Sequence, residues 1–89
     1  MKADKYAPDL KHVPFRSGES VAEIVFSRDN TYRVVIAQRQ PNLYHVYLEM
    51  WDVSDWEFLG RGYWNPHDTH NTFADTLETA RELALEKLR

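Results

Sequence analysis

The sequence predicts an α+β domain: a four-stranded antiparallel β-meander with one C-terminal α-helix packed on one face, in the order β-β-β-β-α. Three observations predict this class. Runs of β-branched or alternating apolar residues follow one another between residues 21 and 64. The breaks between these runs are short enough for antiparallel neighbours, and the last residues repeat apolar positions at helical spacing. A chain of 89 residues has room for one domain with a small core.

We expect residues 1–20 to form an irregular N-terminal arm, because Pro8, Pro14 and Gly18 interrupt any periodic pattern. Residues 21–89 then form the single α+β domain. Its strands are separated by segments that contain Asn, Asp, Pro and Ser, the residues that favour turns. In chain order the expected strands are Val21–Phe26, Thr31–Arg39, Leu43–Trp51 and Trp56–Trp64.

The final element is a helix that we predict from Asp75 to Leu88. Asp75 can cap its first turn, and Glu78 three residues later completes a capping-box-like pair. An apolar stripe marks the face that packs on the sheet, and glutamates mark the opposite face. The stripe consists of Leu77, Ala80, Ala84 and Leu88. Its alanines allow the helix to lie close to the strands.

The second and third strands can be aligned from the sequence. A three-residue loop at Gln40–Asn42 places Ile36 opposite Val46 and Arg33 opposite Glu49, and this opposite-charge pair supports the alignment. One face of the sheet then carries an apolar core for the helix. Its expected members are Ile24, Phe26, Tyr32, Val34, Ile36, Tyr44, Val46, Leu48, Met50, Leu59 and Tyr63.

The alignment of the fourth strand, Trp56–Trp64, stays open. A four-residue loop at Asp52–Asp55 places Trp51 opposite Trp56 and both glycines of the strand on the outer face. The same alignment places Glu57 and Arg61 on the core face. An edge strand that extends past the helix, or a bulge at a glycine, would each resolve this conflict.

Aromatic residues are concentrated between Leu43 and Trp64, which hold seven of the 12 in the chain. A single helix covers only one sheet face, so alternation along the strands sends part of these rings to an uncovered outer face. Exposed Trp and Tyr side chains are typical anchors of protein interfaces. The predicted partner-binding residues on this face are Tyr47, Trp51, Trp56, Phe58, Trp64 and Arg33.

We therefore predict a small non-enzymatic binding module that contacts a protein partner, or a second copy of itself, through the aromatic outer face. The alternative is a nucleic-acid-binding module that stacks bases on the same residues. Two purely structural interpretations compete with both. Trp51 and Trp56 could stack as a cross-strand pair that stabilises the hairpin, or the N-terminal arm could cover the face.

Charge and cysteine content narrow the function classes. A net charge of −3 argues against nucleic acid, whose binding relies on clustered Lys and Arg. The absence of cysteine removes disulfides, thiolate chemistry and cysteine-based zinc sites, and it favours a cytoplasmic location. The polar start Met1–Lys5 is followed by no apolar run, so we expect neither a signal peptide nor a membrane span.

Catalysis has little support in the sequence. The serines lie in turns or at strand ends outside any nucleophile motif, and no glycine-rich phosphate loop is present. His67, Asp68 and His70 could donate metal ligands, but a site needs three or four ligands with fixed geometry, so a polar loop is the preferred interpretation. We expect no enzyme activity, no cofactor and no metal site.

The segment Thr72–Ala80 resembles the sheet-to-helix junction of two known groups. One is the AP2 and phage-integrase type of DNA-binding domain, in which a three-stranded sheet reads the major groove. The other is the HicB-like antitoxin family, with its D-T-x-E-A entry into a helix. The first resemblance implies basic residues on the exposed strand face, where this sequence has aromatic ones. No functional residue is carried over from either group.

Overall fold

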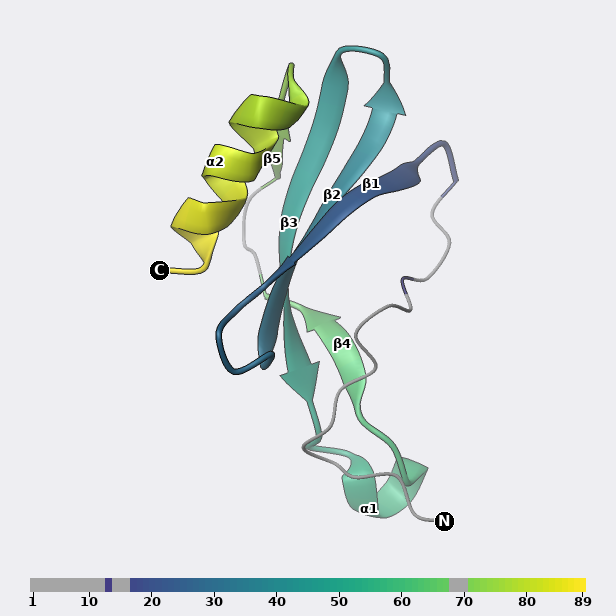
Figure 1. Ribbon diagram of the computed structural model, residues 1–89. Coiled ribbons are helices and arrows are strands. Elements are labelled where there is room, and N and C mark those ends of the chain that lie inside the picture. The colour runs from purple at the N-terminus through teal and green to yellow at the C-terminus, as the bar shows by residue number, and fades with distance from the viewer. Residues whose placement is uncertain (1–12, 14–16, 68–70) are drawn as a thin grey trace.

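The predicted fold class is confirmed. The computed structural model describes Val13 and residues 17–67 and 71–89, and it shows an antiparallel sheet with one C-terminal helix packed on one face (Figure 1). Of the expected N-terminal arm, only Val13 and residues 17–20 belong to this part. The elements are β1 (Ser20–Phe26), β2 (Tyr32–Gln40), β3 (Leu43–Asp52), α1 (Trp56–Leu59), β4 (Tyr63–Pro66), β5 (Thr72–Ala74) and α2 (Leu77–Lys87).

The prediction of one strand over Trp56–Trp64 is wrong. Its first half is the single helical turn α1, which ends where Gly60 takes a left-handed conformation at φ 67° and its N–H donates to the Trp56 carbonyl at 2.8 Å. The strand β4 begins only at Tyr63. A run of four apolar and charged residues fits one helical turn as well as a short strand, so periodicity alone could not separate them.

On the side of β3 that faces away from β2, two short strands pair with different parts of β3. Trp51 pairs with Trp64 of β4, whereas His45, nearer the other end, pairs with Phe73 of β5. The predicted pairing of Trp51 with Trp56 is therefore wrong. The sheet has five strands in the described part of the chain, one more than expected, and β1 to β4 follow each other in sequence order.

The alignment of β2 with β3 is confirmed, because Ile36 lies opposite Val46 and Arg33 lies opposite Glu49. The turn between β2 and β3 is one residue shorter than predicted. A shift between Gln38 and Gln40 brings Gln40 opposite Leu43, which leaves a two-residue loop in place of the expected three.

The face assignment of β1 is corrected. Ile24 lies opposite Val35 and Phe26 opposite Arg33, so both point to the outer face and not to the helix. The turn that follows decides this pairing: the Ser27 N–H donates to the Tyr32 carbonyl at 2.9 Å, so Ser27 lies opposite Tyr32 and Phe26 opposite Arg33. A shift of one residue moves every side chain of a strand to the other face.

Asp29 stabilises the turn between β1 and β2. Its Oδ1 accepts hydrogen bonds from the Thr31 hydroxyl at 2.7 Å, the Ser27 hydroxyl at 2.9 Å and the Thr31 N–H at 3.1 Å. These bonds lower the pKa of Asp29, those from Thr31 most. Asn30 has a positive φ of 61°, as its residue type favours.

The helix-side core lies between α2 and the middle of the sheet. Its buried residues are Val34, Ile36, Val46, Ala74, Ala80 and Ala84, and Val25, Tyr44, Leu48, Leu77, Leu83 and Leu88 pack against them. The predicted stripe of the helix is thus confirmed. Neither described helix is long and apolar enough to cross a membrane.

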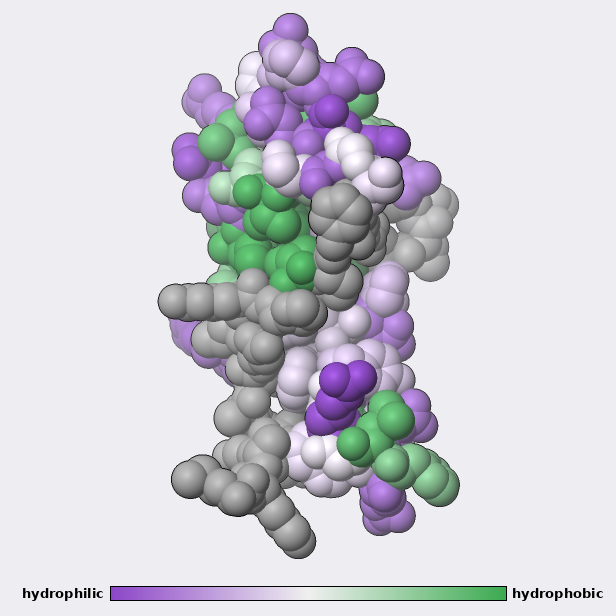
Figure 2. All heavy atoms as spheres, turned by 90° about the vertical axis from the view of Figure 1, so that its right-hand side faces the viewer, coloured by the Kyte–Doolittle hydropathy of each residue, from purple (hydrophilic) through white to green (hydrophobic). Residues whose placement is uncertain are grey.

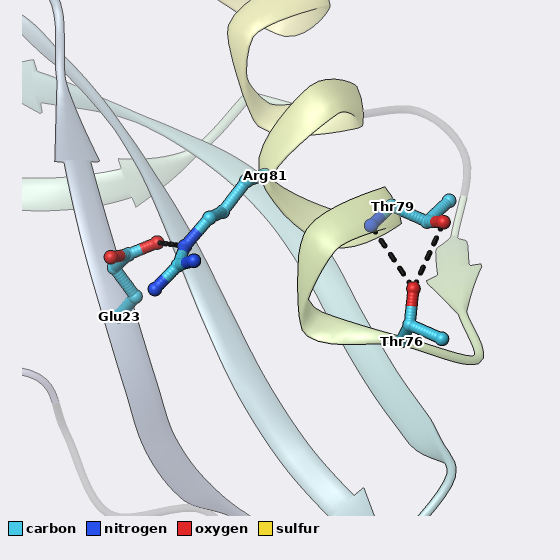
Figure 3. A network of polar contacts seen from close by, with 4 residues as sticks. All are labelled: Glu23, Thr76, Thr79 and Arg81. Carbon is cyan, nitrogen blue, oxygen red and sulfur yellow. Dashed lines mark hydrogen bonds and ion pairs between the residues drawn. The ribbon is translucent and has the colours of Figure 1, made fainter.

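The helix α2 begins at Leu77, two residues later than predicted, and Asp75 is not its N-cap. Thr76 is its N-cap, and the Thr76 hydroxyl oxygen accepts a hydrogen bond from the Thr79 N–H at 3.1 Å (Figure 3). The helix also reaches the edge of the sheet, because Arg81 Nε lies 2.7 Å from Glu23 Oε2 on β1 (Figure 3). That contact joins α2 to β1.

Candidate protein-binding surface

The outer face of the sheet contains a buried ion pair. Arg33 Nε on β2 donates to Glu49 Oε1 on β3 at 2.7 Å, and both side chains are almost completely buried. The Arg33 guanidinium carbon lies 4.5 Å from the centroid of the Trp64 ring, a distance that suits a cation–π contact. The Arg33 nitrogens Nη1 and Nη2 are buried and make no hydrogen bond within the described part of the chain.

Aromatic rings surround this ion pair. The Trp51 and Trp64 rings meet edge to face with centroids 5.3 Å apart, and Phe26 of β1 lies 6.4 Å from Trp64. We call Phe26, Arg33, Glu49, Trp51 and Trp64 the aromatic cluster. Because its residues come from four strands, it holds the outer face together as the helix-side core holds the other.

Gly62 makes the position of Trp51 possible. A Cβ atom added at Gly62 would lie 2.5 Å from Cζ2 of the Trp51 ring, closer than such atoms approach. Gly62 allows Trp51 to pack closely, and Gly60 ends α1.

Tyr47 lies in a second small core on the same face. It is buried together with Val35 and Ala37, and Val13 packs against this group. Its ring centroid lies 4.9 Å from that of His45. Tyr47 is therefore not an exposed anchor. The expectation that the N-terminal arm covers this face holds at Val13, and the remainder of residues 1–16 lies outside the described part.

Two adjacent exposed apolar side chains lie on α1. Phe58 is 89% exposed and Leu59 is 53% exposed, while Trp56 is half-buried. We call these three residues the α1 tip. It lies at the far end of the molecule from the β2–β3 turn (Figure 1), where a small group of hydrophobic atoms stands out from polar surroundings (Figure 2).

Hydrogen bonds hold the base of the α1 tip. The Asp52 carboxylate accepts from the Ser54 N–H at 2.8 Å and from the Asn65 amide at 3.0 Å. The Tyr63 hydroxyl donates to Asp55 Oδ2 at 3.1 Å. Hydrogen bonds from Ser54 lower the pKa of Asp52, and the hydrogen bond to Asp55 raises the pKa of Tyr63. The tip is presented on a fixed base.

The six predicted binding residues separate into two groups. Four of them share the outer face of the sheet: Arg33 and Trp51 contact Trp64, whereas Tyr47 lies in the second small core. Trp56 and Phe58 stand apart on α1. Sequence reasoning missed Leu59, which it assigned to the core, and Phe26.

Other chemistry has little basis in the described residues. No group of three His, Asp or Glu side chains gathers there as a metal site. His67 packs edge-on against Tyr32 with centroids 5.6 Å apart, while Asp68, Thr69 and His70 lie outside the described residues. An open depression of about 430 Å³ lies between residues 18–20 and 38–41. It contains one separated charge pair, Arg39 and Glu19, with 4.0 Å between Nε and Oε1.

Comparison with protein-family models, with curated proteins and with solved structures found no match to this chain. No family property is therefore transferred to it. The function is argued from the geometry of the α1 tip and the aromatic cluster.

Proposed function

We propose that this chain is a small, non-enzymatic binding module that contacts a protein partner through the α1 tip. The carrying observation is the 89% exposure of Phe58 on a one-turn helix with a hydrogen-bonded base. The cysteine-free composition supports a cytoplasmic setting.

An exposed phenylalanine favours a partner on energetic grounds. Full burial of such a side chain is worth about 2–3 kcal/mol relative to leaving it in water, and aromatic anchors are enriched at the centres of interfaces. Leu59 beside Phe58 is also more than half exposed, so a partner pocket could take both side chains together. The fixed base lowers the ordering cost of binding.

Nucleic acid is the weaker alternative. Arg33, a cation expected on the outer face, is fully buried and bonded to Glu49, so it does not face a phosphate. Trp51 and Trp64 pack edge to face in the aromatic cluster, whereas base stacking needs a free ring face. The net charge of −3 gives no general attraction to phosphate.

Site-specific photo-cross-linking tests the proposal. A benzophenone amino acid placed at position 58 is compared with the same amino acid at position 85, because Leu85 is 56% exposed on α2. In extract of the source cells we expect one dominant protein adduct from position 58 and not from position 85. Excess wild-type protein should abolish the adduct, and excess Phe58→Asp protein should not.

A matched competitor guards against general effects of charge. Leu85→Asp protein should compete as well as wild type. Phe58→Asp should leave the free energy of unfolding within about 0.5 kcal/mol of wild type, because Phe58 buries little surface. The proposal fails if Phe58→Asp competes like wild type, or if both positions yield the same adducts.

A further inference from the structure

The strand β1 is the long free edge of the sheet. It pairs with β2 on one side, and no strand lies on its other side in the described part of the chain (Figure 1). It has seven residues, whereas β4 has four and ends at Pro66, and β5 has three. An unpaired edge of this length presents backbone donors and acceptors to another strand.

The pairing of β1 with β2 shows which backbone groups are free. The Ser27 N–H bonds to the Tyr32 carbonyl, so these two residues form a hydrogen-bonded pair. Antiparallel pairs alternate, and the Phe26 and Ile24 pairs with β2 are therefore of the non-hydrogen-bonded kind. The N–H and C=O groups of Ile24 and Phe26 consequently point away from β2, toward the open edge.

The usual protection of an edge strand is weak here. Lysine, proline and inward-pointing charges normally prevent edge-to-edge pairing, but β1 contains neither lysine nor proline. Its one charged residue, Glu23, is bonded to Arg81 of α2. A register shift between Val21 and Glu23 disturbs only the start of the strand.

Apolar side chains also line this edge. Ile24 and Phe26 point to the outer face and are only half-buried, and Val21 is exposed. The side of the molecule on which β1 lies shows a patch of hydrophobic atoms (Figure 2). Ile24 and Phe26 have neighbours on β2 and, among the described residues, no neighbouring strand on the other side. A strand added here would supply one.

We propose that the β1 edges of two copies of this chain pair antiparallel across a two-fold axis, with Val25 opposite Val25 of the second copy. In this register Ile24 lies opposite Phe26 of the second copy, and the two residues exchange N–H···O=C hydrogen bonds. The symmetric contact forms the same bonds a second time. The two sheets become one, with both outer faces on the same side.

Two other two-fold registers would bring residues of the register shift or of the turn into the pairing. An axis at Ile24 would place Phe26 opposite Ala22, which lies at the register shift. An axis at Phe26 would place Ile24 opposite Arg28, which lies in the turn. The axis at Val25 also places Glu23 opposite Ser27, so no like charges meet. The contact is isologous and closes on itself.

The cysteine-free sequence allows a direct test by disulfide trapping. Residues of a non-hydrogen-bonded pair have Cα atoms about 4.5 Å apart, which is within the range that a disulfide spans. Under mild oxidation we expect the Val25→Cys protein to convert to a covalent dimer. Leu85→Cys, which places a thiol on an exposed position of α2, should stay largely monomeric under the same conditions.

A proline variant tests the edge without a thiol. The Ile24 N–H points outward in this geometry, so Ile24→Pro removes an intermolecular donor and leaves the hydrogen bonds to β2 in place. Sedimentation equilibrium should give twice the mass of one chain for wild type and for Phe58→Asp. Ile24→Pro should give the mass of one chain with an unchanged far-ultraviolet circular dichroism spectrum.

Three results would overturn the β1 pairing. They are a monomeric wild type at its highest soluble concentration, a Val25→Cys protein that cross-links no faster than Leu85→Cys, and a dimer that Ile24→Pro leaves intact. A dimer that Phe58→Asp dissociates would place the contact at the α1 tip. Since the photo-cross-linking at position 58 is read separately, the two proposals can fail independently.

Discussion

At the scale of single residues, the Arg33–Glu49 pair shows what alternation can and cannot predict. The register placed these residues opposite each other correctly. Their burial could not be predicted, because it depends on the Trp64 ring that β4 brings over the guanidinium. A charged pair assigned to a binding face is therefore part of the packing of that face.

Breaking this ion pair should be costly. Arg33→Met or Glu49→Leu alone leaves a buried charge without its partner, and each should lower the free energy of unfolding by about 3–5 kcal/mol. The double variant Arg33→Met/Glu49→Leu removes both charges and should lose less than either single variant. Urea denaturation of all four proteins measures the difference. Losses that simply add would show that the charges do not depend on each other.

At the scale of elements, the central strands were predictable and the connections were not. β2 and β3 alternate over their whole length, which decides both pairing and face. Side-chain hydrogen bonds of Asp29 stabilise the turn between β1 and β2. The pairing that this turn sets, with Phe26 opposite Arg33, reversed the predicted faces of β1. The geometry of a turn therefore determines which face of the sheet the side chains of the adjacent strands point to.

The turn into α1 should respond to acid. Hydrogen bonds from Ser54 lower the pKa of Asp52 in the folded protein, so the ionised form contributes stability above the ordinary aspartate pKa of about 4. That contribution is lost as the pH falls through the lower, folded-state pKa. Asp52→Asn cannot titrate, so its stability should decline less between pH 6 and about pH 3.

Denaturation at a series of pH values compares the two proteins. All other carboxylates titrate in both, so the difference between the curves isolates Asp52. Parallel curves would mean that Asp52 titrates alike in the folded and unfolded chains.

At the scale of the whole molecule, stability should fall from the centre of the sheet toward α1. β2 has a strand on both sides, and its residues 34–37 are buried. α1 has no buried residue and is held mainly by bonds at its base. We expect the slowest amide hydrogen exchange at Val34, Ile36 and Val46, and exchange faster by orders of magnitude at Phe58 and Leu59.

Measurement of amide hydrogen exchange by nuclear magnetic resonance checks this order of exchange rates. Protection of the Phe58 and Leu59 amides equal to that of Val34 would show that α1 unfolds only with the entire domain.

The fold class was predictable because it depends on patterns that many residues share. The strand succession and the apolar stripe of α2 each rest on several residues, so one misassigned residue does not change them. The candidate site depends on a few residues whose environment is set by tertiary pairing. Trp64 meets Trp51 only because β4 begins at Tyr63, and no local pattern in the sequence marks that start.

The pairing of β3 with β4 at the base of α1 affects which residues of this protein can vary in sequence. Asp52 and Tyr63 are paired across the base of α1, so residues 53–62 form a closed excursion whose ends are already fixed. Doubling the length of such a loop costs only about 0.6 kcal/mol, and none of its residues belongs to either buried core. Variation at exposed residues of 53–61 can therefore accumulate while the sheet and α2 continue to fold as before, whereas Gly62 must stay without a side chain because a Cβ there would meet the Trp51 ring.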